Sequence, residues 1–98
     1  MLTLTDRMNA FMRTVSAEAT TGAEQLVYLH LLWIDNNLMW REWFGCSDRR
    51  LQSLTYLSKQ SITNAKNKLK QNHWIDYKSD GKKTTIFKII DNDSLLVS

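Results

Sequence analysis

Apolar side chains recur at helical spacing at the start of the chain, at Met8, Phe11, Met12, Val15 and Ala19. This pattern predicts an amphipathic helix within residues 1–20, capped at its start by Thr5 or Asp6. A break at Thr20-Thr21-Gly22 separates it from a second predicted helix at residues 23–36. The second helix is apolar around most of its circumference, so we expect it at the centre of the fold or in a contact between copies.

The segment at residues 38–46 is short and rich in aromatic side chains. Asn36-Asn37 is typical of a helix end, and Phe44–Cys46 is predicted to be a short strand. We expect Trp40 and Trp43 to anchor this connection in the core, because buried aromatic side chains are more common than exposed ones that stack on bases.

Two further predicted helices carry clear cap residues. Ser47 is expected to cap a helix that turns Leu51 and Leu54 inward. Residues 55–57 form the turn before Ser58 caps the next helix. On that helix one apolar stripe contains Ile62, Ala65 and Leu69. At about 100° per residue, the opposite side presents the amide side chains of Gln60, Asn64, Asn67 and Gln71.

A β-hairpin is predicted at residues 74–90, where two strand patterns flank Asp80-Gly81, a strong signal for a two-residue turn. The pairs expected across such a turn are Trp74 with Phe87 and Ile75 with Ile86. The side chains expected to share the core are Ile62, Leu69, Trp74 and Phe87. The lysines gathered near the tip are Lys78, Lys82 and Lys83.

These patterns together predict one domain across residues 1–98, since a chain of 98 residues supports one modest core. The expected fold class is mainly α with a small β-hairpin, a winged helix-turn-helix with an additional N-terminal helix. Its parts are the N-terminal helix at 1–20, the helix-turn-helix at 47–72, the wing at 74–90 and a tail at 91–98.

The cationic residues are concentrated on the predicted helix-turn-helix and wing. Residues 47–88 hold ten Lys or Arg and three Asp, a charge of +7, whereas residues 1–46 and residues 89–98 each carry −2. A cationic unit is typical of binding to a polyanion, and amide side chains read bases in a major groove. A solvated lysine-rich surface is the alternative interpretation of the charge alone. The residues expected to contact double-stranded DNA are Arg49, Arg50, Ser58, Lys59, Gln60, Ser61, Thr63, Asn64, Asn67, Lys68, Lys78, Lys82 and Lys83.

No arrangement of residues indicates an enzyme or a bound cofactor. The chain has no catalytic spacing of carboxylates, histidine and cysteine, and no phosphate-binding glycine loop. His30 falls within an apolar helix and His73 at a helix end. Cys46 is the single cysteine, which excludes an internal disulfide and a cysteine-based metal site. No apolar run is long enough to span a membrane and no secretion signal is present, so we expect a cytoplasmic protein.

Several short motifs occur in a fixed order, namely Trp40-x-Glu42-Trp43-Phe44, Leu54-Thr55-x-Leu57-Ser58, Ala65-Lys66-Asn67-x-Leu69, Ile75-Asp76-Tyr77-Lys78 and Phe87-Lys88-Ile89. Over residues 5–90 the chain resembles the N-terminal winged-helix domain of DnaD-like replication initiators. These are the replisome organisers of phages and plasmids of low-GC Gram-positive bacteria. The resemblance implies origin DNA binding, self-association and recruitment of replication or helicase-loading proteins.

The chain departs from that family at three positions. Arg41 stands where the family often has Pro, and Tyr56 and His73 stand where it often has Gly. Because glycine favours a positive φ, each of the two larger residues is expected to cost about 1 kcal/mol of stability, His73 less. The family's separate C-terminal domain is absent from these residues, so the chain is either an excised domain or a stand-alone protein.

These features favour sequence-specific binding of double-stranded DNA in phage or plasmid replication initiation. A winged-helix transcriptional regulator of a mobile element is one alternative and a protein-interaction module is another, because a fold does not fix function. The surplus of apolar residues in the N-terminal half predicts a homodimer that leaves both recognition helices free. The expected interface residues are Met8, Phe11, Met12, Val15, Leu29 and Trp33.

Overall fold

A computed structural model of the chain describes residues 3–17, 22–79 and 84–90. The elements follow in the order α1 (Leu4–Ala17), α2 (Gly22–Asn37), β1 (Phe44–Cys46), α3 (Asp48–Thr55), α4 (Lys59–Gln71), β2 (Ile75–Ser79) and β3 (Thr85–Ile89). The fold is mainly helical, with a small antiparallel sheet in the strand order β1-β3-β2. None of the helices in these ranges is long and apolar enough to cross a membrane.

α1 begins with a capping box formed by Thr3 and Asp6. The Asp6 backbone N–H donates to Thr3 Oγ1 at 3.1 Å, and the Thr3 backbone N–H donates to Asp6 Oδ2 at 3.1 Å. The hydrogen bond from the Thr3 backbone favours the ionised carboxylate and lowers the pKa of Asp6. The predicted cap at Thr5 or Asp6 is wrong, because Asp6 is the partner of the cap and Thr3 is the cap itself.

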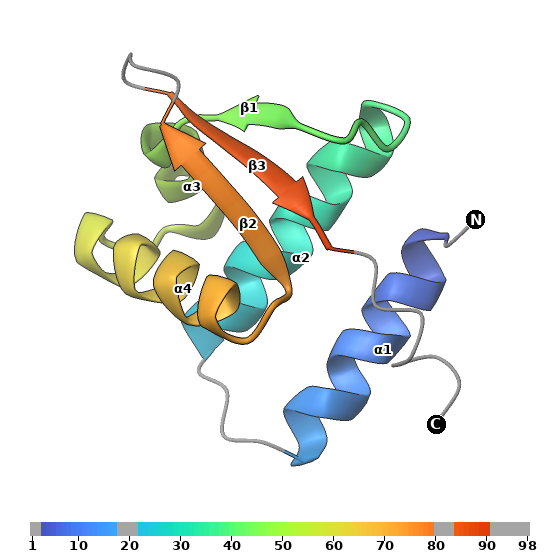
Figure 1. Cartoon of the computed structure of the whole chain (residues 1–98). Coiled ribbons are helices and arrows are strands. Elements are labelled where there is room, and N and C mark those ends of the chain that lie inside the picture. Colours follow the sequence, from blue (N-terminus) through green and yellow to red (C-terminus); the bar gives the residue numbers. More distant parts are fainter. Residues whose placement is uncertain (1–2, 18–21, 80–83, 91–98) are drawn as a thin grey trace.

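α2 lies at the centre of the fold, as its apolar circumference predicts. Val27, Leu31 and Leu32 are fully buried. The helix passes behind the sheet in Figure 1, with α1 on one side and α4 on the other. It ends at Asn37, where the sequence predicts a stop. The central position of α2 therefore places α1 and α4 on opposite sides of the molecule.

The register of β2 and β3 differs from the prediction. Ile75 pairs with Ile89 and Tyr77 pairs with Phe87. The pairs that the turn signal predicted, and that are wrong, are Trp74 with Phe87 and Ile75 with Ile86. The displacement is an odd number of residues, so it exchanges the two faces of the strand. The observed register is favoured because it turns Ile75, Phe87 and Ile89 toward the helices.

The connection between β2 and β3 is longer than two residues. β2 ends at Ser79 and β3 begins at Thr85, so Asp80-Gly81 is only part of the connection. The predicted turn at Asp80-Gly81 falls within residues 80–83, which lie outside the described residues. The predicted strand at Phe44–Cys46 is confirmed, and it forms the third strand by pairing with β3.

An aromatic cluster fixes α1 to the rest of the fold. The core predicted for Ile62, Leu69, Trp74 and Phe87 is confirmed, since all four are buried. The Phe11 ring lies 4.2 Å from the Tyr28 ring and 5.1 Å from the Trp74 ring, measured between centroids. Phe11 is only 1% exposed. Its predicted place in a dimer interface is wrong, because its ring already fills the core of one copy.

The two tryptophans before β1 have different environments. Trp40 packs against the core, as predicted, and the Arg7 guanidinium lies 4.2 Å from the centroid of its ring. Trp43 does not join the core. β1 turns Phe44 and Cys46 inward, so Trp43 falls on the outward side, where Lys78 Nζ lies 4.3 Å from its ring centroid. The prediction that Trp43 is a core anchor is wrong.

Candidate nucleic-acid interface

α3 and α4 each begin after the serine that the sequence predicts as a cap. The Arg50 backbone N–H donates to Ser47 Oγ at 3.1 Å, and the Ser61 backbone N–H donates to Ser58 Oγ at 3.1 Å. Each cap satisfies a donor that the first helical turn leaves without an intrahelical acceptor. The starts of both helices are therefore fixed by local hydrogen bonds as well as by packing.

The turns at the two ends of α4 use the left-handed backbone region. Tyr56, which ends α3, has a φ of 60°, and His73, which follows α4, has a φ of 63°. These are the two positions at which a positive φ was expected, and the expectation is confirmed, as is the place of His73 at a helix end. The Tyr56 side chain is 93% exposed. Its ring therefore gains almost nothing from packing to offset the backbone strain.

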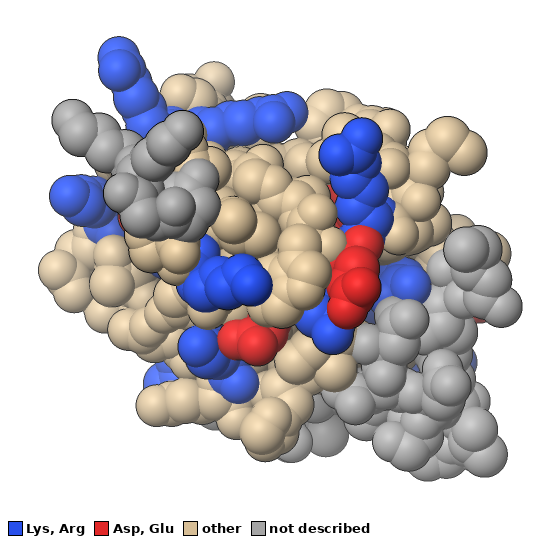
Figure 2. Space-filling model, turned by 45° about the horizontal axis from the view of Figure 1, so that its top comes forward, with Lys and Arg blue, Asp and Glu red and all other residues tan. Residues whose placement is uncertain are grey.

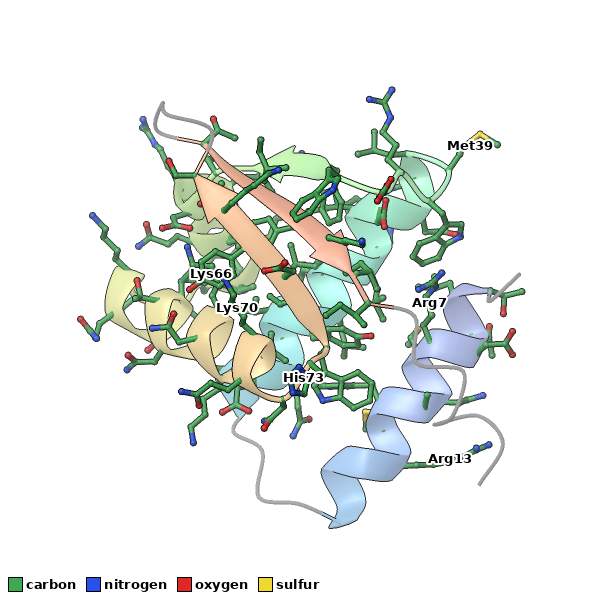
Figure 3. The ribbon with its side chains drawn as sticks, in the orientation of Figure 1. Arg7, Arg13, Met39, Lys66, Lys70 and His73 are labelled. Atoms are coloured by element: carbon green, nitrogen blue, oxygen red, sulfur yellow. The ribbon has the colours of Figure 1, made fainter. Side chains whose placement is uncertain are left out.

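A buried ion pair joins α4 to the start of α3. Lys66 Nζ lies 2.7 Å from Asp48 Oδ1, with the two side chains 8% and 29% exposed. An ammonium that loses its hydration needs such a partner. Figure 3 shows Lys66 and Lys70 projecting from α4 toward the sheet. The pair fixes the two helices relative to each other and removes one lysine of the cationic segment from the surface.

The side of α4 opposite the core is exposed, as the helical spacing predicts. Its four exposed amide residues, which we call the amide face, are Gln60, Asn64, Asn67 and Gln71. Lys59 and Lys68 are exposed beside it, whereas Ser61 and Thr63 are half-buried. The predicted inward stripe is confirmed by the buried side chains of Ile62, Ala65 and Leu69.

Two hydrogen bonds constrain the amide face. Gln60 Nε2 donates to Asn64 Oδ1 at 3.1 Å, and the Tyr77 hydroxyl of β2 donates to Asn67 Oδ1. Each of these carbonyl oxygens already accepts one hydrogen bond and keeps one lone pair, whereas the amide N–H groups of Asn64 and Asn67 can donate to a ligand. Those donors match the N7 and O6 acceptors of guanine, whereas bidentate contact with adenine also uses the carbonyl oxygen.

A second polar link connects the end of α4 to β2. Lys70 Nζ lies 3.3 Å from Asp76 Oδ1 and donates to the Tyr77 carbonyl oxygen at 3.3 Å. The hydrogen bond from Lys70 lowers the pKa of Asp76. Lys70 and Tyr77 were not predicted as part of the site. Lys66 and Lys70 are four residues apart and so lie on the same side of α4, and this spacing was the one signal in the sequence. Their partners could not be predicted, because those depend on the register of the strands.

The other predicted contacts lie on α3, at the cap of α4 and on β2, or fall outside the described residues. The exposed ones are Arg49, Arg50, Ser58 and Lys78. Lys82 and Lys83 lie outside the described residues. Figure 2 shows Lys and Arg side chains distributed over one face of the molecule, with acidic side chains between some of them. On that face the cations are therefore dispersed and do not form one compact patch (Figure 2).

A hollow of about 550 Å³ lies between α4 and the start of α2. Side chains on its walls include Ala23, Glu24, Ser61, Asn64, Lys68 and Gln71. The hollow leaves one side of α4 uncovered, so the amide face is accessible to a large ligand.

The described ranges contain no group of three His, Cys, Asp or Glu side chains that could hold a metal ion. Comparisons of the chain with protein-family models, with curated proteins and with solved structures found no match in any of the three. The function must therefore be argued from the surface itself.

Proposed function

We propose that the protein binds double-stranded DNA sequence-specifically, with α4 in the major groove. The observation that carries this proposal is the amide face, which is exposed on the capped helix α4. α4 contains no acidic residue and carries Lys59, Lys68 and Lys70. A helix with this surface suits the major groove, which is wide enough to admit one and is bordered by phosphates.

The fold that we propose is a winged helix-turn-helix. Its order is helix α2, strand β1, helices α3 and α4, and strands β2 and β3, with α1 as an additional helix. In this fold the second helix of the helix-turn-helix places its N-terminal residues on base edges. Base contacts are therefore assigned to Gln60 and Asn64, and a phosphate contact to the start of α4 at Ser58 and Lys59. The wing carries Lys82 and Lys83 to the phosphate backbone.

Within DNA binding, we favour initiation of replication of a phage or plasmid in the cytoplasm, with helicase-loading proteins as further partners. This choice rests on the resemblance of residues 5–90 to DnaD-like initiators. A transcriptional regulator would use the same surface of α4, so the target site distinguishes the two. Repeated sites within an origin favour replication, and a site that overlaps a promoter favours regulation.

Two copies are proposed to associate through α1 and α2. Four large apolar side chains are exposed on these helices, namely Met8 at 38%, Met12 at 43%, Leu26 at 40% and Trp33 at 49%. Predicted interface residue Leu29 is half-buried beside them, and the side chain of Val15 lies outside the described residues. A two-fold contact on this side leaves α4 free in both copies to bind two half-sites.

Selection of bound duplexes from genomic fragments tests the proposed function. The expected result is enrichment of fragments that share a short motif, with an affinity that falls linearly with salt concentration on a log–log scale. Enriched fragments without a common motif would contradict sequence-specific reading. If the protein binds no duplex even at low salt, DNA binding is excluded and the protein-interaction module becomes the better interpretation.

A further inference from the structure

The two faces of the sheet have different chemistry. The inward face carries Phe44, Ile75 and Phe87, which are buried against the helices. No helix of the described residues crosses the outward face of β2 and β3 in Figure 1. An antiparallel sheet with one solvated face normally places polar side chains there. The outward face of this sheet also carries an indole, that of Trp43.

Trp43 is surrounded by cations and does not pack on the core. Its ring centroid lies 4.3 Å from Lys78 Nζ and 5.7 Å from Lys88 Nζ. The side chain is half-buried, so part of the ring remains accessible to solvent. The part of the ring that is left open lies beside these two ammonium groups, so it offers a stacking surface next to positive charge.

The acidic side chains on this face are already paired with lysines. Glu42 Oε1 lies 3.4 Å from Lys88 Nζ, and Asp76 Oδ1 lies 3.3 Å from Lys70 Nζ. Lys78 has no acidic partner in the described part of the chain. The charge that remains around Trp43 is therefore positive and complements a phosphate backbone.

We propose that the outward face of the sheet, centred on Trp43, is a binding site for a single-stranded nucleic acid. An indole stacks on any unpaired base, while Lys78 contacts a flanking phosphate. A duplex does not suit this site, because its bases are stacked on one another and cannot reach the indole. The site takes one or two nucleotides on Trp43 and has no means of base-specific reading.

This site is separate from the amide face of α4. α4 turns Ile62 and Leu69 toward the core, and the sheet turns Phe87 toward the same core. The two surfaces adjoin along β2, where Lys70 of α4 reaches Asp76 and the Tyr77 hydroxyl reaches Asn67, but they are built from different side chains. Substitutions at Trp43 and on the amide face therefore test the two sites separately.

The test uses fluorescence anisotropy of the full chain with labelled oligo(dT) and oligo(rU) of about ten nucleotides, a length that suits one small site. Wild-type protein is expected to bind at least one of them, and the pair shows which sugar is preferred. Trp43→Ala should weaken that binding roughly 5- to 150-fold, which is the loss of one stacked base. Trp43→Phe should restore most of it, because phenylalanine keeps a stacking ring.

Two further variants serve as matched controls. Tyr56→Ala removes another exposed aromatic ring, at the end of α3, and should leave binding of the single strand unchanged. Asn64→Ala should lower the sequence preference for a duplex and leave the affinity for the single-stranded oligonucleotide unchanged. The proposal is overturned if neither oligonucleotide binds, or if Trp43→Ala binds as tightly as wild type. It is also overturned if Trp43→Ala melts at the wild-type temperature but loses duplex and single strand together.

Discussion

The amide face of α4 and the outer surface of α1 and α2 are both exposed helical surfaces built over one small core. On α4 the exposed residues include amides and lysines, and three of the amide side chains take part in side-chain hydrogen bonds. On α1 and α2 the exposed residues include Met8, Met12 and Trp33. The first surface is stable in water, whereas the second leaves apolar area in contact with water.

The apolar surface contains a groove of about 430 Å³ between α1, α2 and α3. The side chains that line it are Leu4, Met8, Leu29, His30, Trp33 and Leu54. The Nδ1 atom of His30 is hydrogen-bonded to the Leu26 carbonyl oxygen at 2.7 Å, so the histidine is a structural part of this wall. This difference is the reason that we propose two kinds of partner, a charged polymer for α4 and a second copy of the chain for α1 and α2.

The largest expected effect on stability distinguishes the buried side of α1 from its exposed side. Phe11→Ala should lower the free energy of unfolding by about 3–5 kcal/mol, because it removes the ring that packs on Tyr28 and Trp74. Met12→Ala, whose side chain is 43% exposed, should change it by about 0.5 kcal/mol. Urea denaturation at two protein concentrations measures both. If the loss of stability in Phe11→Ala appeared only at the protein concentration at which the dimer forms, the ring would lie in the dimer interface and not in the core.

The next effect tests whether the ion pair between Asp48 and Lys66 stabilises the packing of α4 against α3. Asp48→Ala should cost about 3 kcal/mol, because the buried Lys66 ammonium loses its partner. The double variant Asp48→Ala with Lys66→Met should recover a large part of that loss. Glu42→Ala breaks the exposed pair with Lys88, whose side chains are 74% and 39% exposed, and should cost about 0.5 kcal/mol at most. Equal losses in the single and double variants would show that the ion pair is not the cause.

A third, smaller effect is expected on association through α1 and α2. Trp33→Ser should weaken a homodimer by about 2 kcal/mol, as expected for truncation of a central aromatic residue. Sedimentation velocity at micromolar concentration should show a shift toward the 11.5 kDa monomer. Wild-type protein that sediments only as the monomer would rule out this interface. The control is Lys68→Ser on α4, which lies across α2 from α1, and this variant should sediment like the wild-type protein.

The smallest effect concerns the border of the DNA surface. Lys82→Ala or Lys83→Ala should weaken binding to every duplex alike and lower the salt slope by about one, because one phosphate contact is lost. Arg13→Ala removes an exposed cation from α1, on the side remote from α4 in Figure 3, and should leave the slope unchanged. An unchanged slope in both lysine variants would mean that the wing does not contact DNA.

The features of the fold predicted correctly are those set by neighbouring residues. The caps at Ser47 and Ser58 and the inward stripe of α4 follow from local hydrogen bonds and helical spacing. The positive φ at Tyr56 was expected because that position often holds a glycine in the family that the chain resembles. The amide face could be placed on the surface for the same reason, since it is the complement of a buried stripe.

The features that were missed depend on contacts between distant segments. The turn signal at Asp80-Gly81 implied a register that the pairing of apolar faces overrides. The ion pair of Asp48 and Lys66 joins residues on different helices and leaves no local trace. Trp43 could have been placed outward by strand alternation, because its neighbour Phe44 faces inward. The hydrogen bond from Tyr77 to Asn67 could be found only once the register was known.

The most direct test of the account compares two asparagines on opposite sides of the molecule. Asn64 lies on the amide face, and Asn9 is an exposed residue of α1. The measurement is the affinity of each alanine variant for a selected duplex and for a scrambled duplex of equal length and composition. Asn64→Ala should lose about 1–3 kcal/mol of preference for the selected duplex, and Asn9→Ala should lose none. Full preference retained by Asn64→Ala would contradict the proposal that α4 reads DNA through its amide face.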